Sequence, residues 1–174
     1  MTQTTDRHGS ATVELPGDRE ILITRKFDAP AALVFEAWTT PELVKRWWGF
    51  GSWEWLVCDI DLREGGKWRY LTRDKEGGME VGFHGEYREI EAPHRIVSTE
   101  VYEGFPSPDP DADAALNTIV FDERDGVTTM TINVLHRLPE HRDGHIESGM
   151  ESGMQTSMDR LEDVVVARGG AARD

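Results

Sequence analysis

The sequence predicts one α+β domain, in which a curved antiparallel sheet of six to seven strands wraps around a long C-terminal helix and two short helices follow the first strand. Strand-like segments separated by turn residues follow one another between residues 53 and 136. After residue 139, apolar residues recur every three or four positions, as on one face of a helix. A chain of 174 residues is long enough for one core and too short for two substantial ones.

The two ends of the chain are expected to lie outside this domain. Residues 1–18 mix polar residues and glycine without a period, which indicates a disordered tail. Residues 169–174 follow the last apolar position of the helix and are expected to fray. The domain is therefore assigned to residues 19–168.

A strand and two short helices are expected to begin the domain. Residues 20–27 are rich in β-formers and predict the strand. The proline before residues 31–38 suits the first turn of a helix, where its missing N–H costs nothing. Thr39 and Glu42 have the spacing of a capping box, so a second helix is expected from there to about Trp48.

The sheet is expected to continue as an antiparallel meander. Glycine pairs and an Asp-Gly hairpin signal separate its strands, which are expected over residues 53–62, 67–73, 79–91, 94–102, 116–123 and 127–136. Residues 104–113 contain three prolines and are read as an acidic loop that could form a flap.

One long helix is expected to close the domain. Its apolar stripe consists of Ile146, Met150, Met154, Met158, Leu161 and Val165. Gly149, Gly153 and Ser157 form a second stripe beside the methionines. Either these small residues allow close packing against the sheet, or they leave room for a ligand. Both interpretations place that stripe on the inward face.

Composition excludes several classes of function. The formal net charge of -14 disfavours nucleic acid and anionic membrane surfaces as partners. No run of about 18 apolar residues predicts a membrane span. Cys58 is the one cysteine, so no intramolecular disulfide can form; we expect it to be buried and inert, and the protein to be cytoplasmic.

Aromatic residues and methionines are the candidates for binding a ligand. All six tryptophans fall between residues 38 and 68, and aromatic side chains suit stacking on an apolar or aromatic molecule. Ordinary core packing is the alternative for each. Strand alternation places His84 and Tyr87 on opposite faces unless a bulge intervenes. The candidate set is Trp47, Trp48, Trp55, Trp68, Tyr70, His84, Tyr87, Met130, Met150, Met154 and Met158.

The sequence contains no decisive catalytic or metal-binding set. It has no phosphate-cradling glycine loop, nucleotide fingerprint or recognisable Ser-His-Asp arrangement. His141 and His145 are spaced to share a metal, with His136 nearby, but a polar surface turn explains these histidines more simply. No catalytic residue, metal or cofactor is therefore assigned.

Several segments together resemble a known family. In order along the chain, they are Ile23–Pro30, Val34–Glu42, Lys45–Gly49, Asp61–Trp68, Gly85–Ile90, Pro93–Val97 and Met158–Glu162. They are similar to signatures of the helix-grip domains related to the activator of the heat-shock protein 90 ATPase, within the START-like superfamily. The resemblance covers about residues 20–168. It implies β-α-α-β6-α topology with a hydrophobic cavity between sheet and helix.

Three functions follow as hypotheses. The first is binding of a small hydrophobic or aromatic molecule in that cavity, in a stress or secondary-metabolism role, with no catalysis. The second is a polyketide cyclase- or aromatase-like enzyme using His84, Tyr87 or Asp59 as acid or base. The third is an interaction protein that modulates a chaperone through its acidic surface. A second copy of the chain is a further partner hypothesis.

Overall fold

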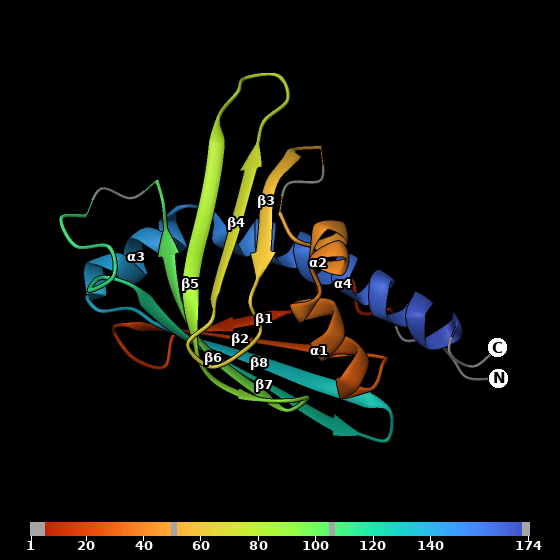
Figure 1. The fold of residues 1–174 in the computed structure, drawn as a ribbon. Helices are drawn as coiled ribbons and strands as arrows, with labels where there is room; N and C mark the ends of the chain where they lie inside the picture. Colours follow the sequence, from red (N-terminus) through yellow and green to blue (C-terminus); the bar gives the residue numbers. More distant parts are fainter. Residues whose placement is uncertain (1–5, 50–51, 105–106, 172–174) are drawn as a thin grey trace.

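The computed structural model describes residues 6–49, 52–104 and 107–171. Its strands are β1 (Thr12–Glu14), β2 (Glu20–Phe27), β3 (Glu54–Ile60), β4 (Lys67–Arg73), β5 (Glu80–Glu91), β6 (Arg95–Tyr102), β7 (Ala115–Arg124) and β8 (Val127–Leu135). Its helices are α1 (Ala31–Thr39), α2 (Pro41–Trp47), α3 (Pro139–Glu147) and α4 (Met150–Ala171). Figure 1 shows the sheet curving around one side of α4, with α1 and α2 beside it.

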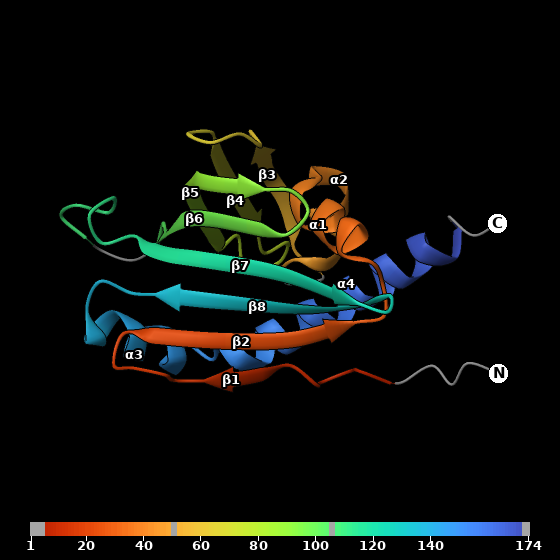
Figure 2. The same cartoon turned by 90° about the horizontal axis from the view of Figure 1, so that it is seen from below.

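The strands form one curved antiparallel sheet, which confirms the predicted fold class. Their order is β1-β2-β8-β7-β6-β5-β4-β3, and each neighbouring pair is antiparallel. Figure 2 shows β1, β2, β8 and β7 side by side, seen from the outer face of the sheet. The tight β7–β8 turn has the expected Asp125-Gly126 pair, both residues with positive φ, as a hairpin of this twist requires. The sheet has eight strands within the described residues, rather than six to seven.

The additional strand comes from the segment expected to be a tail. Thr12–Glu14 pairs with Thr24–Leu22 of β2. The preceding residues are held by α4: Asp159 accepts a hydrogen bond from the Gly9 N–H at 2.9 Å. Gln155 exchanges two hydrogen bonds with the backbone of Ala11. Tertiary contacts that local composition does not reveal therefore order this segment, although residues 1–5 lie outside the described part.

The C-terminal helix is broken rather than continuous. Gly149 has a φ of +81°, a left-handed conformation that ends α3 and separates it from α4. Gly149 and Gly153 are both exposed, so the expected inward-facing stripe of small residues is wrong. The end of the chain also differs from expectation, because α4 continues to Ala171; residues 172–174 are outside the described part.

The capping box expected at the start of α2 does not form. Thr39 is the last residue of α1, and its hydroxyl donates to the Phe35 carbonyl at 2.8 Å. Thr40 is the N-cap of α2 and makes no side-chain capping bond. Pro41 at the first helical position supplies the start signal instead, because its fixed φ suits that position.

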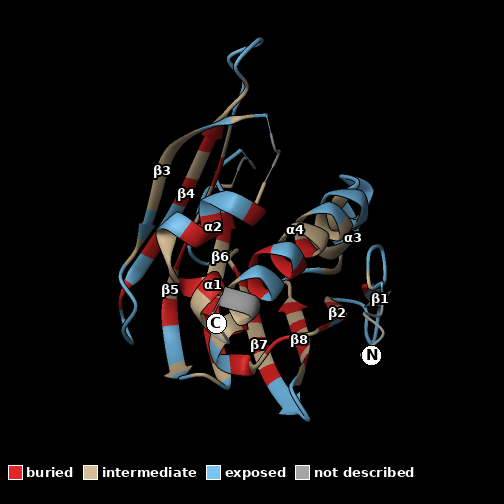
Figure 3. Cartoon of the chain, turned by 90° about the vertical axis from the view of Figure 1, so that its right-hand side faces the viewer, coloured by how far each residue is buried: buried red, intermediate tan, exposed pale blue. Residues whose placement is uncertain are grey.

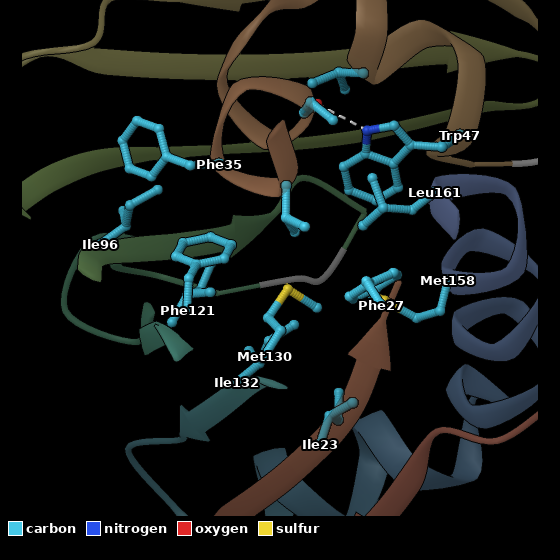
Figure 4. Packing of buried hydrophobic residues seen from close by; sticks show 14 of the residues in the cluster. Ile23, Phe27, Phe35, Trp47, Ile96, Phe121, Met130, Ile132, Met158 and Leu161 are labelled. Carbon is cyan, nitrogen blue, oxygen red and sulfur yellow. Dashed lines mark hydrogen bonds between the residues drawn. The ribbon is translucent and has the colours of Figure 1, made fainter. Parts of the chain in front are cut away.

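One half of the concave face is tightly packed. The inward side chains of β2, β7 and β8 meet α1 and α4, and Phe27, Phe121 and Met130 are at most 1% exposed. Figure 4 shows this core, with Met158 and Leu161 of α4 approaching Phe27. α4 packs mainly against α2 and α1, and β2 is the strand that it contacts most. The helix therefore lies toward one side of the sheet, as Figure 3 shows.

Among the described residues, no helix combines the length and apolar character needed to cross a membrane.

Candidate ligand-binding site

The concave face of β3 to β6 is packed differently from the core beneath α4. Its apolar side chains, with that of Trp48 from the end of α2, contact the core cluster, yet several of them keep accessible surface: Trp48, Trp55, Cys58, Ile60 and Phe83. Their counterparts on β2, β7 and β8 are almost fully buried. The interior is thus filled on one half of the sheet and incompletely covered on the other.

Aromatic rings dominate this second half. Trp48 lies at the end of α2. Its ring centroid is 5.4 Å from that of Trp55, 5.2 Å from that of Tyr70 and 5.5 Å from that of Phe83. Trp68 lies 4.8 Å from Tyr70, and Tyr102 lies 5.2 Å from Phe83. Tilted and edge-to-face contacts at these distances are favourable. We call the set the aromatic cluster: Trp48, Trp55, Trp68, Tyr70, Phe83 and Tyr102.

The structure brings together four sequence-predicted residues in this cluster and adds two. Trp48, Trp55, Trp68 and Tyr70 meet there, although they come from three separate segments: the end of α2, β3 and β4. Phe83 and Tyr102 were missed. They are cross-strand neighbours on β5 and β6, and Phe83 also pairs with Tyr70. The antiparallel register is the signal that could have found them, because directly opposed residues share a face.

Trp47 lies outside the cluster despite its position beside Trp48. It is 2% exposed, and its indole Nε1 donates to the Ala37 carbonyl at 2.9 Å, the dashed line in Figure 4. Its ring packs 4.7 Å from Trp38. Trp47 therefore joins α2 to α1, whereas Trp48 faces the aromatic cluster.

The candidate methionines fall into two groups. Met130 and Met158 are 0% and 4% exposed and belong to the packed core (Figure 4). Met150 and Met154, on the first turns of α4, are half-buried and border the core. Of the four, these two have surface left for a further contact.

His84 lies on the wrong face for the expected site. Its Nδ1 is 3.0 Å from Glu103 Oε2, and Arg69 also bonds Glu103, at 2.9 and 3.0 Å, on the outer surface of the sheet. Tyr87 is buried on the concave face. The two residues have opposite parity on β5, and the bulge in this strand comes only after Tyr87, so it does not change their faces.

A polar pair borders the aromatic cluster on the concave face. Glu100 of β6 accepts a hydrogen bond from Asn117 of β7, with 3.3 Å between Nδ2 and Oε2. Burial raises the pKa of Glu100, partly offset by this bond. The side-chain oxygen of Asn117, Oδ1, is buried and, within the described part of the chain, has no hydrogen-bond partner. Neither residue was among the candidates that the sequence predicted.

Three further ionisable groups on this face, Tyr70, Tyr87 and Cys58, stay neutral at physiological pH. Burial is the main cause that raises the pKa of Tyr70 and Tyr87 well above the ordinary value. Burial also raises the pKa of Cys58 to about 11, so its thiol remains protonated. These groups can donate hydrogen bonds but do not carry charge there.

The three histidines of the sequence analysis lie away from the aromatic cluster. His136 Nε2 and His145 Nδ1 are 3.0 Å apart, and their rings are nearly perpendicular. Burial, followed by the charge of His145, lowers the pKa of His136 to about 4. Within residues 6–49, 52–104 and 107–171, no three His, Cys, Asp or Glu side chains gather as a metal site would require.

A separate depression lies at the β7–β8 hairpin. Its volume is about 510 Å³, and Arg7, Lys26, Asp122 and Arg124 contribute to its walls. The lining is mostly charged, and Val127 and Thr129 beside it belong to the outer face of β8. This feature does not coincide with the aromatic cluster and lacks the apolar walls usual for a small-molecule site.

A sheet gripping a C-terminal helix, with two short helices after the first long strand, defines a helix-grip domain. The sequence model for the family described as "Activator of Hsp90 ATPase homolog 1-like protein" matches residues 28–166. The chain belongs to this family. No curated protein gives a significant match.

Several solved bacterial structures share the fold. A protein from Rhodobacter sphaeroides is 24% identical, with a TM-score of 0.80 over 90% of this chain and 99% of that chain. A protein from Mycobacterium smegmatis is also 24% identical, with a TM-score of 0.76 over 89% and 96% of the two chains. One from Staphylococcus epidermidis is 26% identical, with a TM-score of 0.73 over 90% and 94%.

Proposed function

We propose that the protein binds a small hydrophobic or aromatic molecule between the concave face of β3–β6 and the first turns of α4. The observation that carries this proposal is the aromatic cluster, in which Trp68 and Tyr70 are buried, Tyr102 is exposed, and the remaining three rings are half-buried. Rings in a finished core are expected to be covered, as Phe27 and Phe121 are on the other half of the sheet. Accessible Trp48, Trp55 and Phe83 supply the surface that a ligand would cover.

The chemistry of this surface favours a flat or flexible apolar ligand. Covering apolar surface contributes roughly 25 cal/mol per Å², and stacked aromatic pairs add about 0.5–1.5 kcal/mol. Met150 and Met154 provide unbranched, polarizable side chains on the helix side, which can adapt to different shapes. The few polar atoms on the sheet side would orient the ligand.

Tryptophan fluorescence tests the proposal. Titration with a panel of lipids, flavonoids and polyketides is expected to change the emission of the native protein in a saturable way. Trp48→Ala should weaken this response, whereas Met79→Ala, which removes a side chain of an exposed residue outside the cluster, should leave it unchanged. The absence of a saturable change with every member of the panel would contradict the proposal.

A cyclase- or aromatase-like enzyme is a second candidate, and Glu100 is the observation that favours it. A carboxyl group whose pKa is raised by burial can act as a general acid or base near neutral pH. Of the three residues first considered for this role, His84 and Asp59 lie on the outer side, whereas Tyr87 is buried on the concave face. Turnover of a polyketide substrate that is lost in Glu100→Gln would support the enzyme.

Modulation of a chaperone is a third candidate, favoured by the description of the family. The acidic character of the chain, with 33 acidic and 19 basic residues, would supply the interaction surface. An unchanged ATPase rate of heat-shock protein 90 at saturating protein would remove this candidate. A reducing cytoplasm is the proposed location, supported by a single, half-buried cysteine.

A further inference from the structure

We propose that the ligand carries a protonated amino group, which pairs with Glu100 while the aromatic cluster holds the apolar body of the molecule. This inference rests on the proposed binding function and deepens it by naming the class of ligand. An amine-bearing aromatic or alkyl compound has this combination of groups.

The lack of side-chain donors on the two cross-strand neighbours of Glu100 is the first observation. The β5–β6 register pairs His84 with Val101 and Tyr87 with Ser98, which places Gly85 across from Glu100. On the other side, Glu100 pairs with Ala115 of β7. Neither of these two neighbours has a side chain that can donate a hydrogen bond to the Glu100 carboxyl group.

Gly85 is required by the close approach of the strands. A Cβ at this position would lie 1.8 Å from the Thr99 carbonyl oxygen and 2.6 Å from Trp68 Nε1. The backbone and the indole therefore come close enough to exclude any side chain. The Trp68 indole therefore covers Gly85 and places an aromatic ring beside the strand position across from Glu100.

Unmatched acceptors are the second observation. Asn117 uses its amide nitrogen on Glu100, and its side-chain oxygen is buried without a donor in the part of the chain that is described. The residue as a whole is 9% exposed. No Lys, Arg or His of the described residues forms an ion pair with Glu100. An ammonium group brings N–H donors and a positive charge, which would satisfy both acceptors.

Aromatic rings beside a carboxylate are the third observation. Organic cations are attracted to the faces of tryptophan and tyrosine, most strongly where water is excluded. Glu100 lies on the same face of β6 as Tyr102, and Gly85 across from it lies on the same face of β5 as Phe83, so the carboxyl group and the aromatic cluster share the concave face. The net charge of -14 further favours the approach of cations over anions.

Proton linkage follows from this arrangement. Burial raises the pKa of Glu100, which favours the protonated carboxyl in the free protein. Pairing with an ammonium group favours the carboxylate, so binding should release a proton and tighten as the pH rises. Among the other titratable groups on this face, Tyr70, Tyr87 and Cys58 have raised pKa values that keep them neutral over this range. Tyr102 lies on this face as well. Met150 and Met154 on the helix side do not titrate.

Three compounds with the same phenylbutyl body test the proposal: 4-phenylbutylamine, 4-phenylbutanol and 5-phenylpentanoate. Isothermal titration calorimetry at pH 5.5 and pH 7.5 measures the affinity at each pH. At pH 7.5 the amine is expected to bind at least about tenfold more tightly than the alcohol, a typical effect of one charged pair, and this preference should be smaller at pH 5.5. The carboxylate should bind most weakly.

Two variants assign the effect to one side chain. Glu100→Gln keeps the size and hydrogen-bonding capacity of the group, and it is expected to bring the affinities of amine and alcohol within about twofold. Glu64→Gln removes the same charge from an exposed turn and should preserve the preference. Equal binding of amine and alcohol by the native protein, or a preference that survives in Glu100→Gln, would overturn the amine inference while leaving the binding function intact. Failure of all three compounds to bind would overturn both.

Discussion

Asn117 donates a hydrogen bond to Glu100 over 3.3 Å, from β7 to β6, and this is the single hydrogen bond found for the Glu100 side chain among the described residues. A buried carboxylate is costly unless hydrogen bonds or cations compensate it. One amide donor compensates only part of this cost, and burial accordingly raises the pKa of Glu100. Such an incompletely satisfied group inside a fold is typical of a functional site.

Glu100 should make stability depend on pH in a particular direction. Because its folded-state pKa is raised, the native state is favoured below the unfolded pKa of about 4.3 and loses this advantage as the pH rises through the folded value. Glu100→Gln should therefore unfold at a higher temperature than the native protein at pH 7.5, and the difference should disappear near pH 4. Thermal unfolding across this range measures it. A variant that is less stable at pH 7.5 would contradict the assignment.

Trp47 and Trp48 should respond differently to truncation although they are adjacent. Trp47→Ala removes a fully buried ring and its hydrogen bond to Ala37, and should cost about 3–5 kcal/mol of unfolding free energy. Trp48→Ala removes a half-buried ring, so it should cost less while weakening ligand binding at least about tenfold. Urea unfolding and calorimetry measure the two effects. Equal losses of stability would show that Trp48 is ordinary core.

Arg25 is expected to be a large contributor to stability. Its side chain is fully buried, 3.2 Å from Asp159 and 3.8 Å from Glu162, and it lies over the ring of Phe27. Arg25→Met leaves two carboxylates without their cation and should cost about 3–5 kcal/mol.

Arg73→Met provides the matched surface control for Arg25. Arg73 pairs with Glu54 at 2.8 Å, but both side chains are more than 40% exposed, so the loss should stay below about 1 kcal/mol. Urea unfolding compares the two variants. Similar losses would contradict a special role for the buried arginine.

The contact between His136 and His145 should weaken the fold in acid. The pKa of His136 is lowered to about 4 by burial first and by neighbouring positive charge second. The unfolded chain takes up a proton below about pH 6.5 and the native state does not, so stability is lost as the pH falls from about 6.5 toward 4.

His136→Gln should reduce this acid sensitivity, measured as the change in urea midpoint between pH 7 and pH 4.5. His94→Gln replaces an exposed histidine at the β5–β6 turn and should keep the slope of the native protein. An unchanged slope in His136→Gln would show that the pair does not govern the acid response.

Alternation and turn chemistry made most of the sheet predictable. Residues 67–73 were expected as a strand and form β4 with those bounds. The Asp-Gly signal at residues 125 and 126 marked the β7–β8 turn, because both positions need positive φ. These features depend on neighbours in sequence. The edge strand at Thr12–Glu14 depends instead on pairing with β2, so local composition did not reveal it.

The candidate site was less predictable, for related reasons. The methionine spacing continues across Gly149, and periodicity alone did not show that a left-handed glycine breaks the helix there. Along β6, the apolar Val97 and Val101 lie on the outer face, whereas the polar Ser98 and Glu100 face inward. Hydrophobic periodicity predicts the residues of a fully packed core. A ligand site is lined partly by polar residues, which interrupt that periodicity, so it is harder to predict.

The most direct test of the account is an NMR titration of the native protein with 4-phenylbutylamine, observing the indole N–H signals of its tryptophans. Binding at the proposed site predicts saturable shifts for Trp48, Trp55 and Trp68, with little change for Trp38 and Trp47, which pack together between α1 and α2. Shifts confined to backbone signals of the β7–β8 hairpin, or no saturable shift in the aromatic cluster, would contradict ligand binding on the concave face.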